Sequence, residues 1–207
     1  MNGPPVFRVQ DGLLELDEIE RALGPGGLMI FPTDTLYGLG GRARDQAAAR
    51  RTREAKGRPE SSPLPVVAAD AEQIDGLCPG WRIRAAGLAE AFWPGPLTLV
   101  LPADPRLPRE LTSGTGTLAV RVPGRALTRR LCERLGPLVA TSANRSGAPP
   151  PRTCDEALAS VGAAVDLAID AGPGASLPST VVTLADEGPR LIRSGAIPWE
   201  RVREALR

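Results

Sequence analysis

Short apolar runs separated by glycine, proline and small polar residues predict the β-strands of this chain. Runs of about four to eight apolar residues that end in turn signals are typical of buried strands. The first run is Gly27–Phe31, which Pro32, Thr33 and Asp34 follow directly. The predicted strands are Gly27–Phe31, Leu64–Ala69, Leu97–Leu101, Thr117–Val122, Pro137–Ala140, Leu167–Asp170, Thr180–Leu184 and Arg190–Arg193.

The segments between these strands mix apolar and charged residues in the manner of helices. The segment Asp45–Lys56 begins with an N-capping residue type and is followed by Gly57, a common helix terminator. The predicted helices are Leu14–Leu23, Asp45–Lys56, Ala71–Leu77, Trp81–Phe92, Arg125–Leu135, Asp155–Val161 and Pro198–Leu206. Helices and strands alternate without a break in composition, which predicts one α/β (α+β) domain, residues 1–207, with a mixed sheet.

Composition narrows the class of protein. Hydrophobic residues make up 42% of the chain and charged residues 24%, which is typical of a globular protein. No apolar run reaches the roughly 18 residues of a membrane span, and Met1–Asp17 lacks the pattern of a signal peptide. We therefore expect a cytoplasmic protein without membrane association. Cys78, Cys132 and Cys154 are far apart, so we expect free thiols.

The chain contains no histidine. This excludes Ser-His and Cys-His nucleophile systems, and zinc sites of the H-E-x-x-H kind. Any general base must be a carboxylate, the single lysine, a tyrosine, water or the substrate itself. The sequence therefore predicts a function that needs little proton chemistry from the protein, and it predicts no metal site built from protein ligands.

Charge is nearly balanced overall but is concentrated locally. The net charge is +1, so no global nucleic-acid field is implied. Basic residues dominate Arg42–Arg58, which is either a solvated helix face or an anion site. Lys56 is the only lysine among 25 basic residues. In a chain where arginine fills every other cationic position, this indicates a site that needs a compact ammonium group.

Four polar segments each follow the end of a strand or helix. They share small hydroxyls, amides, glycines and a few cations, a combination that suits a polyanion and a small polar substrate. Taken singly, such segments are usually turns and caps. No Walker A pattern or dinucleotide-binding fingerprint is present. The four segments are Pro32–Gly40, Lys56–Leu64, Arg121–Pro123 and Ala140–Gly147.

Seven sequence blocks, in order, resemble the YrdC/TsaC family. The blocks are FPTDTLYGLG, KGRPESSPL, WPGPLTLVL, LAVRVP, ATSANRSG, STVV and IRSG. The resemblance extends from about Leu14 to Gly195 and is to the short, single-domain form of the family. It implies a twisted mixed β-sheet flanked by helices, with a basic concave face. In one departure from many longer relatives, an apolar residue, Val67, stands where they carry a histidine.

The resemblance also implies the reaction. Members make threonylcarbamoyl-adenylate and pyrophosphate from L-threonine, bicarbonate and ATP with Mg²⁺, which is nucleotidyl transfer. A partner transferase then uses the product for the N6-threonylcarbamoyl modification of tRNA. Threonine's amine and carbon dioxide combine without a protein nucleophile, and the carbamate attacks the α-phosphorus of ATP. This chemistry needs positioning and charge neutralisation, which a protein without histidine can supply.

The position of each residue in the family motifs implies its role. Lys56 and Arg58 are the expected catalytic residues and hold the ATP phosphates. The expected ATP-binding residues are Lys56, Arg58, Ser62, Thr117, Ser142, Asn144 and Arg193. The expected threonine-binding residues are Thr35, Arg121, Thr141 and Ser179, with Arg121 pairing the carboxylate.

Two other functions remain open at this point. The first is a non-catalytic protein that binds tRNA or other double-stranded RNA weakly through the Arg42–Arg58 charge. The second is a module that handles carbamoyl phosphate, like the related domain of hydrogenase-maturation proteins. That larger architecture carries zinc-finger-like cysteines, which this sequence lacks.

Overall fold

The computed structural model describes residues 3–9, 15–175, 177–185 and 188–206. The strands in these ranges are β1 (Val6–Arg8), β2 (Met29–Pro32), β3 (Tyr37–Gly40), β4 (Val66–Val67), β5 (Leu97–Pro102), β6 (Thr117–Arg121), β7 (Leu138–Val139), β8 (Thr141–Ser142), β9 (Leu167–Asp170), β10 (Thr180–Thr183) and β11 (Arg190–Arg193). The α-helices are α1 (Leu16–Leu23), α2 (Gln46–Lys56), α3 (Ala71–Asp75), α4 (Trp81–Phe92), α5 (Arg109–Thr112), α6 (Ala126–Leu135), α7 (Cys154–Val161) and α8 (Trp199–Glu204), and Gly162–Ala164 forms a 3₁₀ turn.

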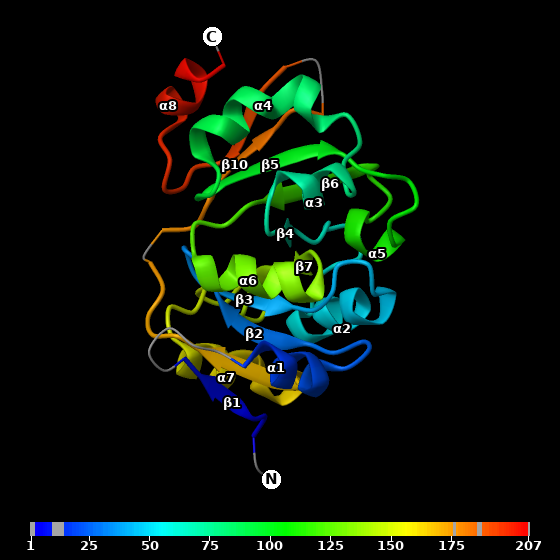
Figure 1. The fold of residues 1–207 in the computed structure, drawn as a ribbon, viewed down its shortest axis with the longest axis vertical. Helices are drawn as coiled ribbons and strands as arrows, with labels where there is room; N and C mark the ends of the chain where they lie inside the picture. The colour runs from blue at the N-terminus through cyan, green and yellow to red at the C-terminus, as the bar shows by residue number, and fades with distance from the viewer. Residues whose placement is uncertain (1–2, 10–14, 176, 186–187, 207) are drawn as a thin grey trace.

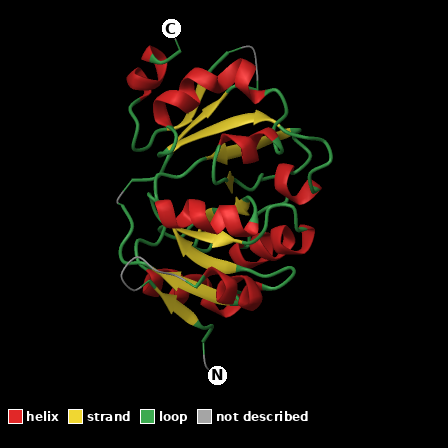
Figure 2. Cartoon of the chain, viewed as in Figure 1, coloured by secondary structure: helices red, strands yellow, loops and turns green. Residues whose placement is uncertain are grey.

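The strands form two mixed sheets flanked by helices (Figure 2). One has the order β1-β9-β2-β3-β8 and the other β11-β10-β5-β6-β4-β7. Both combine parallel and antiparallel pairs, as between β2 and its neighbours β9 and β3. This confirms the predicted α/β class, although the strands divide between two sheets where a single sheet was predicted. The five-stranded sheet, with β1 at its edge, occupies one end of the long axis of the molecule (Figure 1). Strand β10 of the six-stranded sheet and helix α8 lie at the other end.

The two sheets meet where β3 passes β7. Val139 N donates to Gly41 O at 2.9 Å, and Arg42 forms an isolated bridge with Leu138. A Cβ atom at Gly40 would lie 1.9 Å from Val139 O, so only glycine allows this approach. The GLGG sequence therefore joins the two halves of the molecule.

Helices cover the five-stranded sheet on both faces. On one face α1 and α6 pack against Met29, Phe31 and Ile169. On the other face α2 and α7 pack against Ile30 and Leu39. All four residues of β2 are buried, as expected for a strand enclosed on both sides.

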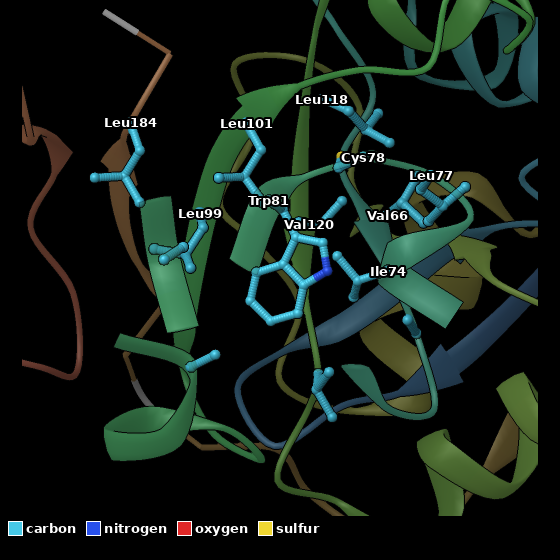
Figure 3. Close-up of a cluster of buried hydrophobic side chains, with 14 of the residues drawn as sticks. Val66, Ile74, Leu77, Cys78, Trp81, Leu99, Leu101, Leu118, Val120 and Leu184 are labelled. Carbon is cyan, nitrogen blue, oxygen red and sulfur yellow. The ribbon is translucent and has the colours of Figure 1, made fainter. Parts of the chain in front are cut away.

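The six-stranded sheet has helices α3 and α4 on one face. Trp81 of α4 lies among Leu99, Val120 and Ile74 in the core on this face (Figure 3). The indole Nε1 also donates to Asp75 Oδ1 at 2.6 Å, which satisfies its one polar atom. The alternate residues of β5 and β6 point to the opposite face, where no helix packs against them in the described hydrophobic clusters.

Most predicted elements are present. The helix Trp81–Phe92 and the strand Leu167–Asp170 have the predicted bounds, and Asp45 caps α2 by accepting hydrogen bonds from two backbone amides. The strand predicted at Leu64–Ala69 is shorter, because only Val66–Val67 pair. The missed strands are β1, β3 and β8, and α5 was also missed. Leu14, the predicted start of the first helix, lies outside the described residues.

Candidate active site

A cavity of about 470 Å³ lies between the open face of the six-stranded sheet and the segments that end β2 and begin β8. Most of the residues predicted to bind substrates line it, although they come from distant parts of the sequence. They are Thr35, Arg58, Arg121, Thr141, Ser142, Asn144, Ser179 and Arg193. The other predicted residues, Lys56, Ser62 and Thr117, do not line the cavity.

One transverse row of residues crosses the six-stranded sheet and forms a wall of this cavity. Val181 of β10 pairs with Arg193 on one side and with Thr98 on the other. Continuing the β5–β6 register by one residue places Thr98 opposite Arg121, which pairs in turn with Val67. All five residues line the cavity. The row therefore runs from Arg193 through Val181 and Thr98 to Arg121 and then Val67, so Val181 and Thr98 lie between its two arginines.

An extra residue in β11 directs Arg193 into the cavity. Val182 pairs with Leu191, whereas Val181 pairs with Arg193, so Ile192 is a bulge. Side chains alternate between the faces of a regular strand, so without the extra residue Arg193 would pair with Thr180 and face the helices. Sequence patterns do not reveal such a bulge, but it explains how the IRSG block reaches the site.

Arg121 is buried, and its charge is balanced by Asp34. The side chain is 7% exposed, and its Nη1 atom lies 3.1 Å from Asp34 Oδ1. Burial lowers the pKa of Arg121, and the Asp34 carboxylate opposes that shift. Arg121 also lines the cavity beside Thr35, and its Nη2 donates to Thr35 Oγ1 at 3.4 Å. Asp34 was not predicted; its place as the one acid in FPTDTLYGLG was the available signal.

Ser179 is fixed from three sides. Arg193 donates from Nη2 to the Ser179 hydroxyl at 3.0 Å, and from Nε and Nη2 to its carbonyl oxygen. Thr98 Oγ1 lies 2.8 Å from Ser179 Oγ. Gly195 packs against the same residue, because a Cβ atom there would lie 2.4 Å from the Ser179 carbonyl carbon. Arg193, predicted to face ATP, thus also holds a residue predicted to bind threonine.

Lys56 lies beneath the loop that follows β8. Its Nζ donates to Ser142 O at 2.5 Å and to Asn144 O at 2.6 Å, and the residue is 4% exposed. Burial and the neighbouring Arg58 charge lower the pKa of Lys56 to about 8, while the two carbonyl contacts favour the ammonium form. The ammonium group thus shapes the Ser142–Asn144 loop, and its contact with phosphate stays a prediction.

A protein-family model matches most of this chain, including the segments that line the cavity. Residues 21–195 fit the Sua5/YciO/YrdC model, described as "Telomere recombination". The chain belongs to the Sua5/YciO/YrdC family.

Individual members of the Sua5/YciO/YrdC family support the same assignment. The threonylcarbamoyl-AMP synthase of Pyrococcus abyssi is 40% identical over 183 residues, which cover 87% of this chain and 54% of the relative. That of Halorhodospira halophila is 37% identical over 165 residues, 79% of this chain and 83% of the relative. The chain thus spans about half the length of the archaeal relative but most of the shorter bacterial one.

A solved family structure has nearly the same backbone. The crystal structure of P. abyssi Sua5 complexed with L-threonine superposes with a TM-score of 0.90 at 38% sequence identity. The match covers 97% of this chain and 60% of that one. The fold that surrounds the cavity is therefore the fold of a family member that was crystallised with threonine.

Of the remaining family-predicted residues, Arg58 and Asn144 line the cavity, whereas Ser62 and Thr117 do not. Arg58 lines the cavity while donating from Nη2 to Pro63 O at 2.9 Å. Asn144 Nδ2 donates to Ala148 O at 2.7 Å, and its buried Oδ1 has no protein partner. Ser62 contributes its carbonyl oxygen to Arg53, and Thr117 bonds to Thr115 at an exposed position. A role for Ser62 and Thr117 in ATP binding stays a prediction.

The basic segment Arg42–Arg58 does not form one continuous solvated face, because most of its cations contact other parts of the protein. Arg51 pairs with Asp166 at 2.9 Å, and Arg42 donates to Gly24 O at 2.9 Å. Arg53 is 9% exposed and donates to two backbone carbonyls at 2.6 Å. Most of these cations therefore stabilise the fold, and Arg58 is the member of the segment that lines the cavity.

Two classes of site do not occur in the described part of the chain. Among those residues no group of three or more His, Cys, Asp or Glu could hold a metal ion. None of the described helices is long and apolar enough to cross a membrane.

Proposed function

We propose that this chain is an L-threonylcarbamoyladenylate synthase, which makes threonylcarbamoyl-AMP and pyrophosphate from L-threonine, bicarbonate and ATP. The observation that carries the proposal is the cavity itself. It combines the buried Arg121 guanidinium, a group of hydroxyls, and the Arg58 charge beside the Ser142–Asn144 loop. Its backbone also closely matches that of a relative complexed with L-threonine.

Threonine would bind at the Arg121 end of the cavity. A guanidinium binds a carboxylate through two parallel hydrogen bonds, and Arg121 is held for this purpose by Asp34. The hydroxyls of Thr35, Thr141 and Ser179 surround the same region and would contact the rest of the amino acid. Because Arg121 is almost enclosed, its interaction with a carboxylate is stronger than that of an exposed ion pair.

ATP would bind across the loop Ser142–Asn144 and Arg58. Arg58 supplies a donor fork for the phosphates, and the unpartnered Asn144 Oδ1 can accept a hydrogen bond from the nucleotide. Lys56 holds the loop and keeps its positive charge close to the same phosphates. Arg193, at the other end of the transverse row, adds a further positive charge.

The chemical step needs little from the protein beyond this arrangement. Bicarbonate takes up a proton and loses water to give carbon dioxide, and the threonine amine loses a proton as it adds to that carbon dioxide. The carbamate oxygen then forms a bond to the α-phosphorus while the bond to the leaving pyrophosphate breaks. The residues hold the reactants in line and offset the negative charge that builds up. No described carboxylate lines the cavity, so Mg²⁺ would enter with ATP, held by phosphate oxygens and water.

The cellular role follows from the product. A mixed anhydride of a carbamate and AMP is a reactive acyl donor, which fits transfer by a partner enzyme to adenosine in tRNA. We place this work in the cytoplasm. The RNA-binding alternative is not favoured, because the Arg42–Arg58 cations are largely engaged within the protein. The carbamoyl-phosphate alternative is not favoured, because the sequence lacks the zinc-finger-like cysteines of that larger architecture.

The test is mass spectrometry of the products formed from ATP, Mg²⁺, bicarbonate and L-threonine. We expect threonylcarbamoyl-AMP and one pyrophosphate for each adenylate, and neither when bicarbonate is omitted. The matched control is Arg121→Ala, which should form far less product at the same threonine concentration. A protein that binds RNA but releases no pyrophosphate, or that requires carbamoyl phosphate, would overturn the proposal.

A further inference from the structure

Thr98, the middle residue of the transverse row, brings its hydroxyl group against that of Ser179, which directly precedes β10. Thr98 Oγ1 and Ser179 Oγ are 2.8 Å apart, and both residues line the cavity. Thr98 is 6% exposed and Ser179 7% exposed, so the pair is protected from bulk water. Thr98 lies within the strand sequence LTLVL. Threonine is a common strand residue, so the sequence alone does not indicate a binding role for it.

Counting hydrogens shows what this pair can offer to a ligand. Arg193 can only donate, so the Ser179 oxygen accepts from it through one lone pair. The Thr98–Ser179 bond uses one of the two hydroxyl hydrogens, whichever residue donates it. The second hydrogen and at least one lone pair remain for the cavity. A ligand alcohol, which has one donor and a good acceptor, matches this pair.

The neighbouring Thr35 hydroxyl differs in this respect. Thr33 Oγ1 donates its hydrogen to Leu36 O at 2.7 Å and accepts from the amides of Thr35 and Leu36 at 3.2 and 3.3 Å, so its 3.0 Å bond to Thr35 Oγ1 uses the Thr35 hydrogen. Its oxygen then accepts from Arg121. Thr35 therefore has no hydrogen left to donate to a substrate hydroxyl, although it can still accept one.

The position of the Thr98–Ser179 pair relative to Arg121 suits an amino acid. Thr98 is opposite Arg121 in the β5–β6 register, and directly opposed residues in an antiparallel pair have Cα atoms about 4.5–5.5 Å apart. The β-hydroxyl of threonine is only a few bonds from the carboxylate. An amino acid whose carboxylate lies on Arg121 can therefore place its β-hydroxyl against Thr98 and Ser179.

We infer that Thr98 is a specificity-determining residue, which together with Ser179 recognises the β-hydroxyl of the amino-acid substrate. The inference rests on the proposed function, which supplies threonine as the ligand. A substrate that lacks the hydroxyl leaves the pair with unmade hydrogen bonds in a buried site, and is rejected for that reason. Arg193 and Gly195 contribute indirectly, because they fix the rotamer and backbone of Ser179.

The test measures binding of L-threonine, L-serine and L-valine by isothermal titration calorimetry in the presence of a non-hydrolysable ATP analogue. Thr98→Val removes the hydroxyl and keeps the shape. We expect the preference for threonine over valine to fall about 10- to 100-fold, the range that corresponds to an unmade buried hydrogen bond. Thr98→Ser, which retains the hydroxyl, should keep most of the preference.

A matched control and a kinetic measurement separate recognition from a structural effect. Thr183→Val alters a buried threonine on the same face of the sheet that does not line the cavity, and it should leave the preference unchanged. In turnover assays, Thr98→Val should raise KM for threonine and leave KM for ATP unchanged. If Thr98→Val does not fold, Thr98→Ala removes the same hydroxyl without adding a methyl group.

The outcomes are distinct. A wild-type protein that binds threonine no better than valine would overturn the proposed function and the inference with it. A wild-type preference that survives intact in Thr98→Val or Thr98→Ala would overturn the inference alone. An equal loss in Thr98→Ser and Thr98→Val would also overturn it, because the effect would then follow from the methyl group or from packing.

Discussion

The two sheets are built from similar strands but differ in what covers them. The five-stranded sheet has helices on both faces, and every residue of β2 and β3 is buried. The six-stranded sheet has α3 and α4 on one face only, and its other face carries Thr98, Ala119 and Arg121 into the cavity. A sheet face without a helix is therefore the surface on which this fold builds a binding site.

The difference assigns separate tasks to neighbouring residues. Along β5, Leu97, Leu99 and Leu101 belong to the core, while Thr98 between them belongs to the cavity. Substitutions on the helix-covered face should change stability, and those on the open face should change substrate binding.

Arg121→Ala should have the largest effect, because Arg121 belongs to both the ion pair and the site. Its loss leaves the buried Asp34 carboxylate without a counter-charge, and we expect a loss of about 3–5 kcal/mol of unfolding free energy. KM for threonine should also rise steeply, while KM for ATP stays nearly unchanged. Denaturant unfolding and steady-state kinetics check the two parts.

The double variant Arg121→Ala, Asp34→Asn separates these two effects. Removing the second charge should recover most of the stability but none of the threonine affinity. Recovery of threonine binding in the double variant would show that Arg121 does not bind the carboxylate, and a rise in KM for ATP instead of threonine would move Arg121 to the nucleotide.

Trp81→Ala tests the covered face. The indole is 2% exposed and lies between α4 and the six-stranded sheet, so its removal should cost about 3–5 kcal/mol of unfolding free energy. Below the new Tm, KM for threonine should match that of the wild type. A changed threonine affinity in folded protein would show that the two faces are not independent.

Lys56→Ala should lower kcat about 10²- to 10³-fold with little unfolding. The cause is the loss of the ammonium group that holds Ser142 O and Asn144 O, and whose charge we propose to act on the ATP phosphates. Lys56→Arg should also fail substantially, because a planar fork does not replace a compact charge in this enclosed position. Near-normal turnover by Lys56→Arg would contradict this assignment.

The kcat/KM of the wild-type protein for different amino acids should depend on whether the substrate side chain carries a β-hydroxyl and a methyl group. Serine keeps the hydroxyl and loses a methyl group, which is worth about 1–3 kcal/mol in an apolar pocket. We therefore expect kcat/KM to decrease from threonine to serine to valine. Valine performing better than serine would show that the site does not recognise the hydroxyl.

A smaller effect concerns pH. Burial lowers the pKa of Lys56 from 10.5 to about 8, so the unfolded chain binds more protons than the folded one between these values. Folding is then disfavoured by the ammonium below pH 8, and the unfolding free energy of the wild type should rise relative to Lys56→Met as pH increases from about 8 to about 10.5. A constant difference between the two proteins across this range would contradict the lowered pKa.

The sequence predicted those parts of the structure that depend on local chemistry. The helix α2 follows from Asp45 and Gly57, which act on their immediate neighbours. The strand β3 was missed because Gly38 and Gly40 interrupt its apolar pattern. Gly38 lies against Phe31 of the neighbouring strand β2, and Gly40 lies against Val139, which is distant in sequence.

The same distinction applies to the site. Arg58, Arg121 and Arg193 were predicted because they belong to recognisable blocks, and all three line the cavity. Thr98 and Asp34 were missed because their importance depends on strand register and on a contact between the two sheets. The burial of Lys56 beneath a loop 86 residues away is likewise a property of the folded chain alone.

The extra residue in β11 has a consequence for comparing sequences. Successive side chains along a strand point to opposite faces of the sheet. The bulge at Ile192 reverses this alternation, so Arg193 points to the face opposite to the one that regular pairing would give it. A homologue could therefore keep the letters IRSG and still turn its arginine away from the cavity if this strand paired with β10 without the bulge. At this strand, the pairing register holds as much information as the identity of the motif, because loss of the bulge would change the composition of the site.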